Sequence, residues 1–392
     1  MRRVILFLSV LAASGIIAAP GASSAAPAPP QPGDYIVDVE NPDCPIGGPI
    51  VRITPSGEAT VLAQGGLLKK PRGTAVQDQN TLIVADGQAG LLKLDLRTGT
   101  VTRIAFGPPW QPREVAIDSD GTYIVADWPD ASADTLRAAN GMTSTSSSGT
   151  RTGPQPTAAP GTVGRLGAQG EASAAAGPPA IYRVTPAGKV TLIASGAPLK
   201  KPHGMSLDAF GNILVTDGGF DGNGPVRVTP DGQMTLLRRY GPGFLQGAAL
   251  RVDGEGNYIV AENTGAVLKL TPDGDLTTHY RGDPFSPHPF QNNPNILGGP
   301  RGLDIDSNGD YIVLDQTQGA LYRLTPGGDI SQIYQGSILC HPAGLMIFRP
   351  GAGGRPPAPA VVPPSAPAVA PDVVPDGGVP DDLGEMPPAS DE

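Results

Sequence analysis

Charged residues recur at one fixed spacing along this sequence. In five short apolar segments, the second residue is followed fourteen positions later by a carboxylate. The five pairs are Arg72 and Asp86, Arg113 and Asp127, His203 and Asp217, Ala248 and Glu262, and Arg301 and Asp315. Where the first member is arginine, the simplest interpretation is a structural ion pair between neighbouring strand ends. Such a pair would be kept because a partly buried charge is costly to leave without its partner.

The pair His203 and Asp217 departs from this pattern and suggests acid–base chemistry. A histidine can be neutral near pH 7, and a carboxylate that orients it makes it suited to act as a general base. The next pair has lost its arginine, since Ala248 stands there, so the carboxylate of Glu262 is left for a cation or a ligand. A purely structural histidine remains the alternative at position 203.

These residue types together define a catalytic hypothesis. In it, His203 is the base, Asp217 orients the imidazole and Arg301 stabilises an oxyanion. Glu262 and Asp315 hold a divalent cation, Mg²⁺ or Ca²⁺, because both ions prefer oxygen ligands. The sequence contains no HExxH, GxSxG, CxxC or phosphate-loop motif that would indicate another catalytic class.

Basic residues near the same positions predict a ligand-binding rim. The dipeptides Lys69–Lys70 and Lys200–Lys201 directly precede two of the apolar segments. A rim of lysine and arginine attracts carboxylates or acidic polysaccharide. Solvated loop lysines that bind nothing are an equally open interpretation. The residues expected to bind a ligand are Arg72, Arg113, Asp86, Asp127, Lys200 and Lys201.

A repeated strand unit must position these side chains. The segment GDYIVLD at 309–315 recurs as NTLIVAD, GTYIVAD, GNILVTD and GNYIVAE, with a truncated form, GDYIV, at 33–37. Each copy is rich in Tyr, Ile, Leu and Val and is bounded by turn residues, which predicts a buried strand. A hairpin with a T-P-x-G turn follows in nearly every unit, and an apolar strand such as PRGLDI precedes it.

The order of these units predicts a closed ring. Five complete four-strand units run from residue 71 to about residue 334. The N-terminal part supplies three further strands, and the segment from Pro342 supplies the fourth. A ring in which the last strand completes the first sheet leaves no sheet edge exposed. We therefore expect an all-β, six-bladed β-propeller closed by strand exchange between the N- and C-terminal parts of the chain.

The two cysteines fit this closure. Cys44 follows the first strand of the split blade, and Cys340 precedes the strand that completes it. In an antiparallel pair these two positions lie at the same end, so we expect a disulfide. A bond that closes a loop of about 300 residues would stabilise the fold by roughly 3–5 kcal/mol in the chain-entropy description. Two unrelated free thiols are the alternative.

The remaining segments divide the chain by composition. Residues 1–26 have the basic start and short apolar stretch of a signal peptide, so the mature protein is expected to be secreted, periplasmic or extracellular. The propeller is expected at 33–349. Pro, Ala, Gly and Ser dominate a leader (27–32), an insertion (128–179) and an acidic tail (350–392), all expected to be disordered.

The charge balance limits the class of partner. There are 27 basic and 37 acidic residues, for a net charge of −10, which argues against nucleic-acid binding. After the signal peptide no apolar stretch is long enough to span a membrane. We expect a monomer that binds a small molecule, an anionic polysaccharide or a protein.

The repeat resembles a known family of propellers. The pattern P-x-G-h-h-h-D-x-x-G-x-h-h-V-x-D followed by h-x-R-h-T-P-x-G, over residues 33 to about 349, is similar to NHL-type repeats and to the virginiamycin B (streptogramin) lyase-like group. The resemblance implies a His and a strand-end acid that, with Mg²⁺, open a lactone by elimination; His203 and Asp217 match those positions. The lyases have seven blades and end this strand in Glu.

Peptidylglycine amidating lyases, which use zinc and several histidines, are a second similar group. Of the histidines that such a site requires, only His203 stands at a matching position. Three functions follow from the sequence as alternatives. The chain is an exported ligand-binding propeller, a metal-dependent lyase or lactone hydrolase, or a structural surface protein.

Overall fold

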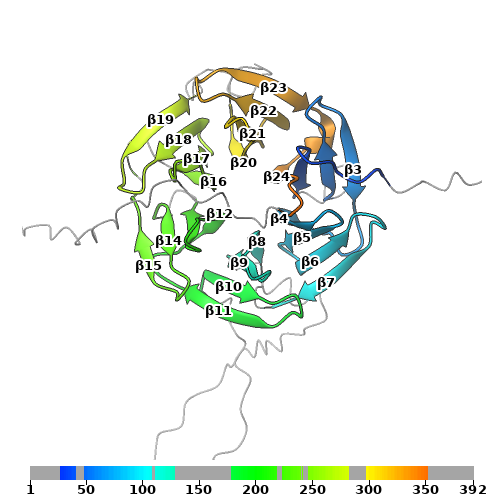
Figure 1. Ribbon diagram of the computed structural model, residues 1–392, viewed down its shortest axis with the longest axis horizontal. Helices are drawn as coiled ribbons and strands as arrows, with labels where there is room; N and C mark the ends of the chain where they lie inside the picture. The colour runs from blue at the N-terminus through cyan, green and yellow to red at the C-terminus, as the bar shows by residue number, and fades with distance from the viewer. Residues whose placement is uncertain are drawn as a thin grey trace, which may run out of the picture.

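The computed structural model describes residues 27–40, 48–107, 111–128, 178–218, 223–239, 241, 246–281 and 297–351. In this part the chain forms six four-stranded antiparallel sheets. Figure 1 shows them as blades around a central axis, with the chain running from one blade to the next. The expected all-β, six-bladed propeller is therefore confirmed. A single turn of 3₁₀ helix, η1 (Ser337–Leu339), accompanies the strands in these residues.

Each blade has its innermost strand at the axis and its outermost strand at the rim. The split blade consists of β24 (Pro342–Ile347), β1 (Tyr35–Val39), β2 (Ile50–Ile53) and β3 (Ala59–Ala63). The next consists of β4 (Pro71–Asp78), β5 (Thr81–Asp86), β6 (Gly90–Asp95) and β7 (Val101–Ala105). The third consists of β8 (Pro112–Ile117), β9 (Tyr123–Asp127), β10 (Ala180–Val184) and β11 (Val190–Ser195).

The other half of the ring repeats this order. The fourth blade consists of β12 (Pro202–Leu207), β13 (Ile213–Asp217), β14 (Val226–Val228) and β15 (Met234–Leu236). The fifth consists of β16 (Gly247–Val252), β17 (Tyr258–Glu262), β18 (Ala266–Leu270) and β19 (Leu276–Arg281). The sixth consists of β20 (Pro300–Ile305), β21 (Tyr311–Asp315), β22 (Ala320–Leu324) and β23 (Ile330–Gln335).

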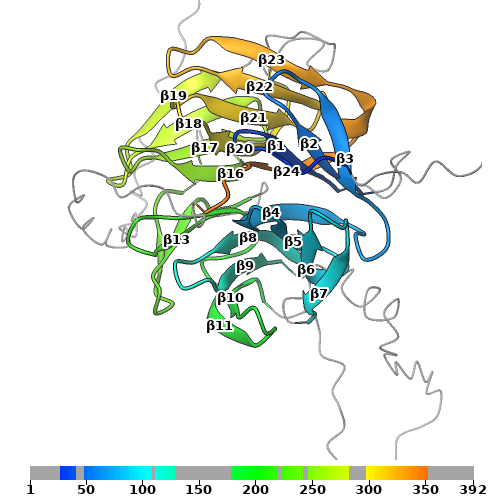
Figure 2. The same cartoon turned by 45° about the vertical axis from the view of Figure 1, so that its right-hand side comes forward.

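The ring closes through the pairing of β24 with β1. The register runs from Tyr35 opposite Ile347 to Val39 opposite Pro342, so strands from the two parts of the chain form one sheet. Figures 1 and 2 both show β24, in orange-red, beside β1, in dark blue. With β24 in place this sheet has four strands, as the other five sheets do, so the ring contains no incomplete blade.

The second strand of every blade is buried along its whole length, as its composition predicts. The strands β1, β5, β9, β13, β17 and β21 are buried at every residue. Their side chains fill the layers between blades; Val37 of β1, for example, shares a cluster with Leu314 of β21. Each blade thus packs against its two neighbours, and this packing fixes the positions of the inner strands around the axis.

The T-P-x-G turns also pack blade against blade. The amide of Gly57 donates to the Thr54 carbonyl, which closes the turn between β2 and β3. Gly57 has φ 86°, and a Cβ there would lie 2.6 Å from the carbonyl oxygen of Ile333 on β23. Glycine is therefore needed both for the turn and for the close approach of the two outer strands.

The predicted flanking segments fall mostly outside the described residues. These are residues 1–26 and 352–392, most of the insertion, and Cys44. The insertion leaves β9 and re-enters at β10, which pair directly, with Asp127 opposite Ala180. Residues 27–32 form no helix or strand, and the Gln31 amide donates to Asp34 Oδ2 at 2.6 Å. Within the described ranges no helix is long and apolar enough to cross a membrane.

Candidate functional site

The six inner strands begin at the same end of the axis, and their second residues converge there. Each inner strand carries an irregularity in its pairing at this point; between β4 and β5, for example, the register skips Arg72. A bulged residue leaves the regular alternation, so its side chain is turned toward the axis. Together with two glutamates these residues line a cavity that we call the mouth: Glu40, Arg72, Arg113, Glu114, His203, Ala248, Arg301 and Ala343.

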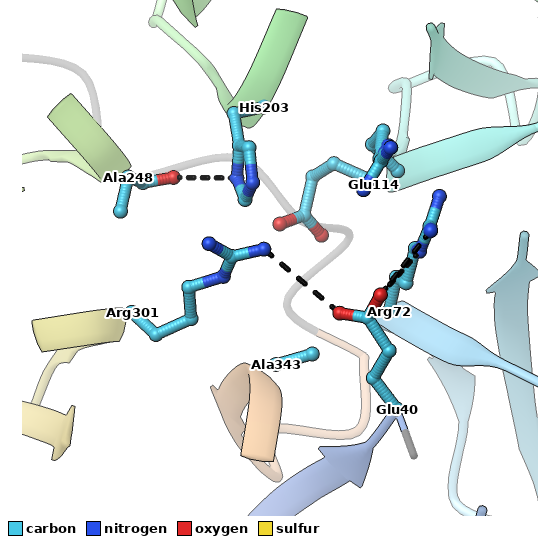
Figure 3. A pocket seen from close by; sticks show the side chains of 8 residues that line it. Glu40, Arg72, Glu114, His203, Ala248, Arg301 and Ala343 are labelled. Atoms are coloured by element: carbon cyan, nitrogen blue, oxygen red, sulfur yellow. Dashed lines mark hydrogen bonds and ion pairs between the residues drawn. The ribbon is translucent and has the colours of Figure 1, made fainter. Parts of the chain in front are cut away.

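Figure 3 shows how these side chains meet. The carboxyl groups of Glu40 and Glu114, the guanidinium of Arg301 and the imidazole of His203 all point toward one space on the axis. The cavity among them has a volume of about 10 Å³, which is enough for one water-sized group. A larger ligand can therefore place only one small group in the mouth.

Glu40 is the acidic centre of the mouth. One of its carboxylate oxygens lies 3.0 Å from Lys70 Nζ and 3.2 Å from Arg72 Nη2, and the other lies 3.9 Å from Arg301 Nη2. Burial alone would raise the pKa of Glu40, but the charges of Arg72, Arg301 and Lys70 outweigh it and lower the pKa to about 2. This carboxylate is therefore ionised at neutral pH.

Glu114 is in the opposite state. Burial raises the pKa of Glu114 to about 8; Arg251 opposes this rise, and the carboxyls of Asp38 and Asp304 add to it. Most of the Glu114 carboxyl is consequently protonated at pH 7. Its position in the inner strand is occupied by Gly or Ala in the other five blades: Gly73, Gly204, Ala249, Gly302 and Gly344.

His203 is a neutral histidine with a defined tautomer. Its Nδ1 lies 3.2 Å from the carbonyl oxygen of Ala248, and because a carbonyl only accepts, Nδ1 carries the proton. Burial lowers the pKa of His203 well below 6.5, and the positive charges of Arg301, Arg113 and Arg72 lower it further. Nε2 is left as a hydrogen-bond acceptor on a ring that points into the mouth.

Asp217 is placed differently from the catalytic hypothesis. Its carboxylate accepts hydrogen bonds from the amides of Lys200, at 2.8 Å, Lys201 and Asn223, at 2.9 Å. The group that orients His203 is thus a backbone carbonyl, and Asp217 holds the loop before β12 instead. Burial raises the pKa of Asp217, against these three amides and the charge of Lys200.

The expected Arg–Asp pairs are replaced by another arrangement. Asp86 is fully buried and accepts from the amides of Lys69 and Lys70 at 2.7 and 2.8 Å. It also accepts from the amides of Gln88 and Ala89, both at 2.9 Å. Arg72 pairs across the blades with Glu40 instead. Asp127 likewise accepts from the Gln111 amide at 2.7 Å.

The two residues expected to hold a cation are also bonded to their own loops. Glu262 accepts from the Gln246 amide at 3.2 Å and the Thr264 hydroxyl at 2.6 Å. Asp315 accepts from the amides of Gly298 at 2.6 Å and Gln318 at 3.0 Å, and burial raises its pKa. No three His, Cys, Asp or Glu side chains of the described residues form a metal-ligand cluster. Both carboxylates are bonded to their own loops and do not converge with a third ligand in these residues, so we carry the metal role no further.

The remaining predicted ligand-binding residues lie around the mouth. The Arg113 guanidinium stacks 4.2 Å from the centre of the Trp128 ring, and Lys201 Nζ lies 5.4 Å from the same ring. Lys200 is exposed, and the amides of both lysines bind Asp217. The dipeptide therefore serves the loop through its backbone and the rim through its side chains.

Sequence reasoning missed Glu40, Glu114 and Trp128 as site residues. A signal existed for Glu114, because it breaks the Gly or Ala pattern of the inner strands. Glu40 directly follows β1, where the equivalent residues of the other blades are Gly87, Trp128, Gly218, Asn263 and Gln316. Only Glu40 is acidic in that set, so the departure from the repeat was visible for it as well.

No protein-family model and no curated protein matches this chain. A chain of a nidogen/laminin complex has a TM-score of 0.54 at 13% identity, over 80% of this chain and 97% of that one. A protein of unknown function from Bacteroides caccae has a TM-score of 0.49 at 13% identity, over 80% and 98%. Virginiamycin B lyase from Staphylococcus aureus has a TM-score of 0.42 at 16% identity, over 76% and 73%. The group that the sequence resembles is therefore represented among the solved structures found.

Proposed function

We propose that the mouth binds a carboxylate or a similarly small anionic group of a ligand that lies across this end of the propeller. The observation that carries this proposal is the charge of the cavity. Three guanidinium groups, those of Arg72, Arg113 and Arg301, face one ionised carboxylate, that of Glu40. The other two titratable side chains, Glu114 and His203, are held neutral at pH 7.

The hydrogen-bonding capacity of the mouth supports the same proposal. Nη1 of Arg72 and Nε of Arg301 are buried donors that meet no acceptor in the described residues. A buried donor without an acceptor costs about 1–3 kcal/mol, and a bound anion removes that cost. Arginine also binds carboxylates in a bidentate geometry that lysine cannot reproduce.

The size of the cavity defines the class of ligand. A volume of about 10 Å³ admits one oxygen-sized group, such as one oxygen of a carboxylate, so the rest of the ligand lies on the surface around it. Lys70, Lys201 and Trp128 lie on that surface. A cationic surface with an aromatic ring suits a small organic acid or an acidic polysaccharide built from uronic-acid units.

The site of action follows from the sequence. We infer that residues 1–26 direct export, so that the protein meets its ligand outside the cytoplasm. The two cysteines support this inference, because a disulfide between Cys44 and Cys340 would persist in an oxidising compartment.

The proposal is tested by calorimetric titration with trigalacturonate. The wild-type protein is expected to bind the acid and to bind its neutral methyl ester at least tenfold more weakly. Arg301→Gln should weaken binding of the acid roughly tenfold, because it removes a charged donor from the mouth. Lys189→Gln removes the same charge from an exposed turn and should leave binding unchanged. Equal binding by the acid and the ester, or by wild type and Arg301→Gln, would refute the proposal.

A second candidate function rests on His203. Its Nε2 accepts a proton and points into the mouth, next to the Arg301 guanidinium. With His203 as base, Nε2 would take a proton from a water molecule that attacks a lactone carbonyl, and Arg301 would face the developing oxyanion. The ring C–O bond would then break, and the leaving alkoxide would take the proton back from His203. A lactone-opening assay of wild type and His203→Ala tests this candidate. Equal rates in both proteins would remove His203 as the base.

A further inference from the structure

The end of the axis opposite the mouth contains a much larger cavity. Its volume is about 500 Å³, and the second halves of the inner strands line it. We call it the lower cavity. Protein sites for small organic molecules have volumes of about 300–1,000 Å³, so this cavity has the size of a ligand site.

Its shape follows from one position in the repeat, the fifth residue of each inner strand. In β4, β8 and β12 this residue is small: Ala75, Ala116 and Ser206. In β16, β20 and β24 it is Arg251, Asp304 and Met346. All six line the lower cavity. The first three strands are neighbours in the ring (Figure 1). Their small residues therefore leave space on one side of the axis.

Arg251 separates the lower cavity from the mouth. Its Nη1 donates to the carbonyl of Met205 on β12 and its Nη2 donates to that of Leu345 on β24, both at 3.2 Å. These strands belong to opposite blades, so the side chain crosses the axis. The two cavities are therefore distinct sites with different linings.

The walls and the charges of the lower cavity indicate an amphipathic ligand. Val76, Ile117, Met205, Ile305 and Ile347 make the walls largely apolar. Two arginines lie together on one side: Arg349 Nη1 lies 3.1 Å from Asp304 Oδ2, and Arg251 Nε lies 3.9 Å from Asp304 Oδ1. Two guanidinium groups thus share one carboxylate.

Two further acidic residues of the rim have basic partners that they share with other carboxylates. Asp253 lies 3.4 Å from Lys269 Nζ, which lies 2.9 Å from Glu255. Asp306 lies 3.7 Å from Arg323 Nη2, and Arg323 Nε lies 3.8 Å from Asp310. Asp304 also accepts from the Ile347 amide at 2.6 Å, so a ligand carboxylate would share Arg251 and Arg349 with an oxygen that is already bonded within the fold.

We propose that the lower cavity is a second ligand site, which takes a hydrophobic organic acid. The acyl or aromatic body lies in the hollow beside Ala75, Ala116 and Ser206, and the carboxylate faces Arg251 and Arg349. This proposal is independent of the anion site in the mouth, because the two sites share no lining residue.

The test is a calorimetric titration of the full chain with octanoate and, separately, with 1-octanol. Octanoate is expected to bind at least tenfold more tightly than the alcohol. Ala116→Phe and Ser206→Leu each fill the hollow, so each should abolish octanoate binding. Two filling variants from different blades are used because one of them could fail to fold, and the circular dichroism spectrum and melting temperature identify a folded variant.

A matched control isolates the contribution of Arg349. Lys189→Gln removes a positive charge from an exposed turn and should leave octanoate binding unchanged, whereas Arg349→Gln should weaken it roughly tenfold. Octanoate binding that survives in a folded filling variant would overturn the proposed location. Octanol binding as tight as that of octanoate would overturn the proposed class of ligand.

Discussion

At the scale of single residues, protonation decides what the mouth can bind. Glu40 and Glu114 lie in one cavity, yet the pKa of the first is lowered to about 2 and that of the second is raised to about 8. Cations surround Glu40, whereas burial dominates at Glu114. If both were ionised, the three arginines would exceed the carboxylates by one charge, whereas the neutrality of Glu114 raises this excess to two.

The pH dependence of stability tests the state of Glu114. Its folded-state pKa, about 8, lies above the unfolded value of 4.5, so its contribution to stability is complete below pH 4.5 and is lost as the pH rises through 8. We expect wild type to lose up to about 4 kcal/mol relative to Glu114→Gln between pH 5 and pH 9. Urea unfolding of both proteins across this range measures the difference, which would be constant if Glu114 were ionised throughout.

Removal of the Glu40 charge should destabilise the fold. Glu40→Gln leaves the Arg72 and Arg301 guanidiniums facing each other without a counter-charge, and breaking a buried ion pair in this way costs roughly 3 kcal/mol. The free energy of unfolding at pH 7 measures this loss. Glu58→Gln, at an exposed turn, is the control and should change it by less than about 0.5 kcal/mol. Equal effects would show that Glu40 is not the centre of the ion pairs.

At the scale of elements, the acidic residue at the end of the second strand of a blade fixes the loop that precedes the innermost strand of the same blade. Asp86, Asp217 and Asp315 each accept backbone hydrogen bonds from that loop. The spacing of fourteen residues predicted that these acids lie near the inner strand, and they do. It did not predict the bulge that turns the arginine toward the axis, since a bulge depends on how the finished strands pair.

Asp86→Asn should destabilise the second blade. The Asn side chain keeps one acceptor oxygen but places an NH₂ group, which only donates, among four backbone N–H groups that need acceptors. We therefore expect the free energy of unfolding to fall by about 2–3 kcal/mol. Asp95→Asn, at the solvent-facing end of β6, is the matched control and should cost much less, because its amide partners there are exposed. Chemical unfolding compares the two, and a smaller loss for Asp86→Asn would contradict the loop-holding role.

At the scale of the whole molecule, the pairing of β24 with β1 makes the ring. The sequence predicted this closure because the two ends of the repeat array complement each other, and the register from Tyr35 to Val39 confirms it. Cys340 lies two residues before β24, and Cys44 lies outside the described residues, so the disulfide stays a prediction.

The proposed disulfide has a measurable consequence. We expect the unfolded, unreduced protein to show no thiol that reacts with Ellman's reagent. Reduction should lower the free energy of unfolding by roughly 3–5 kcal/mol, because the bond closes a loop of about 300 residues. The double variant Cys44→Ser, Cys340→Ser should be insensitive to reductant. Two reactive thiols before reduction would contradict the pairing.

The fold was predictable from the sequence, whereas the site was predictable only in part. Each blade repeats a local pattern of turn and strand residues, so the structure of a blade can be predicted from a short segment of sequence. The mouth is built from side chains that come from all around the ring. The pKa of Glu114, for example, is raised by burial and by carboxyls on other blades, which the local sequence does not reveal. His203 and the arginines were found because they occupy one repeated position at which the residue type varies. Their hydrogen-bond and ion-pair partners lie on other blades, so the spacing within one repeat does not predict them.

The most direct test of the positive mouth is the affinity for trigalacturonate at pH 7 and pH 9, in wild type and Glu114→Gln. Wild type should bind roughly tenfold more weakly at pH 9, because ionised Glu114 cancels one positive charge in the cavity. Glu114→Gln should bind equally at both values. Wild-type affinity that does not change with pH, or that changes as much in the variant, would contradict the account.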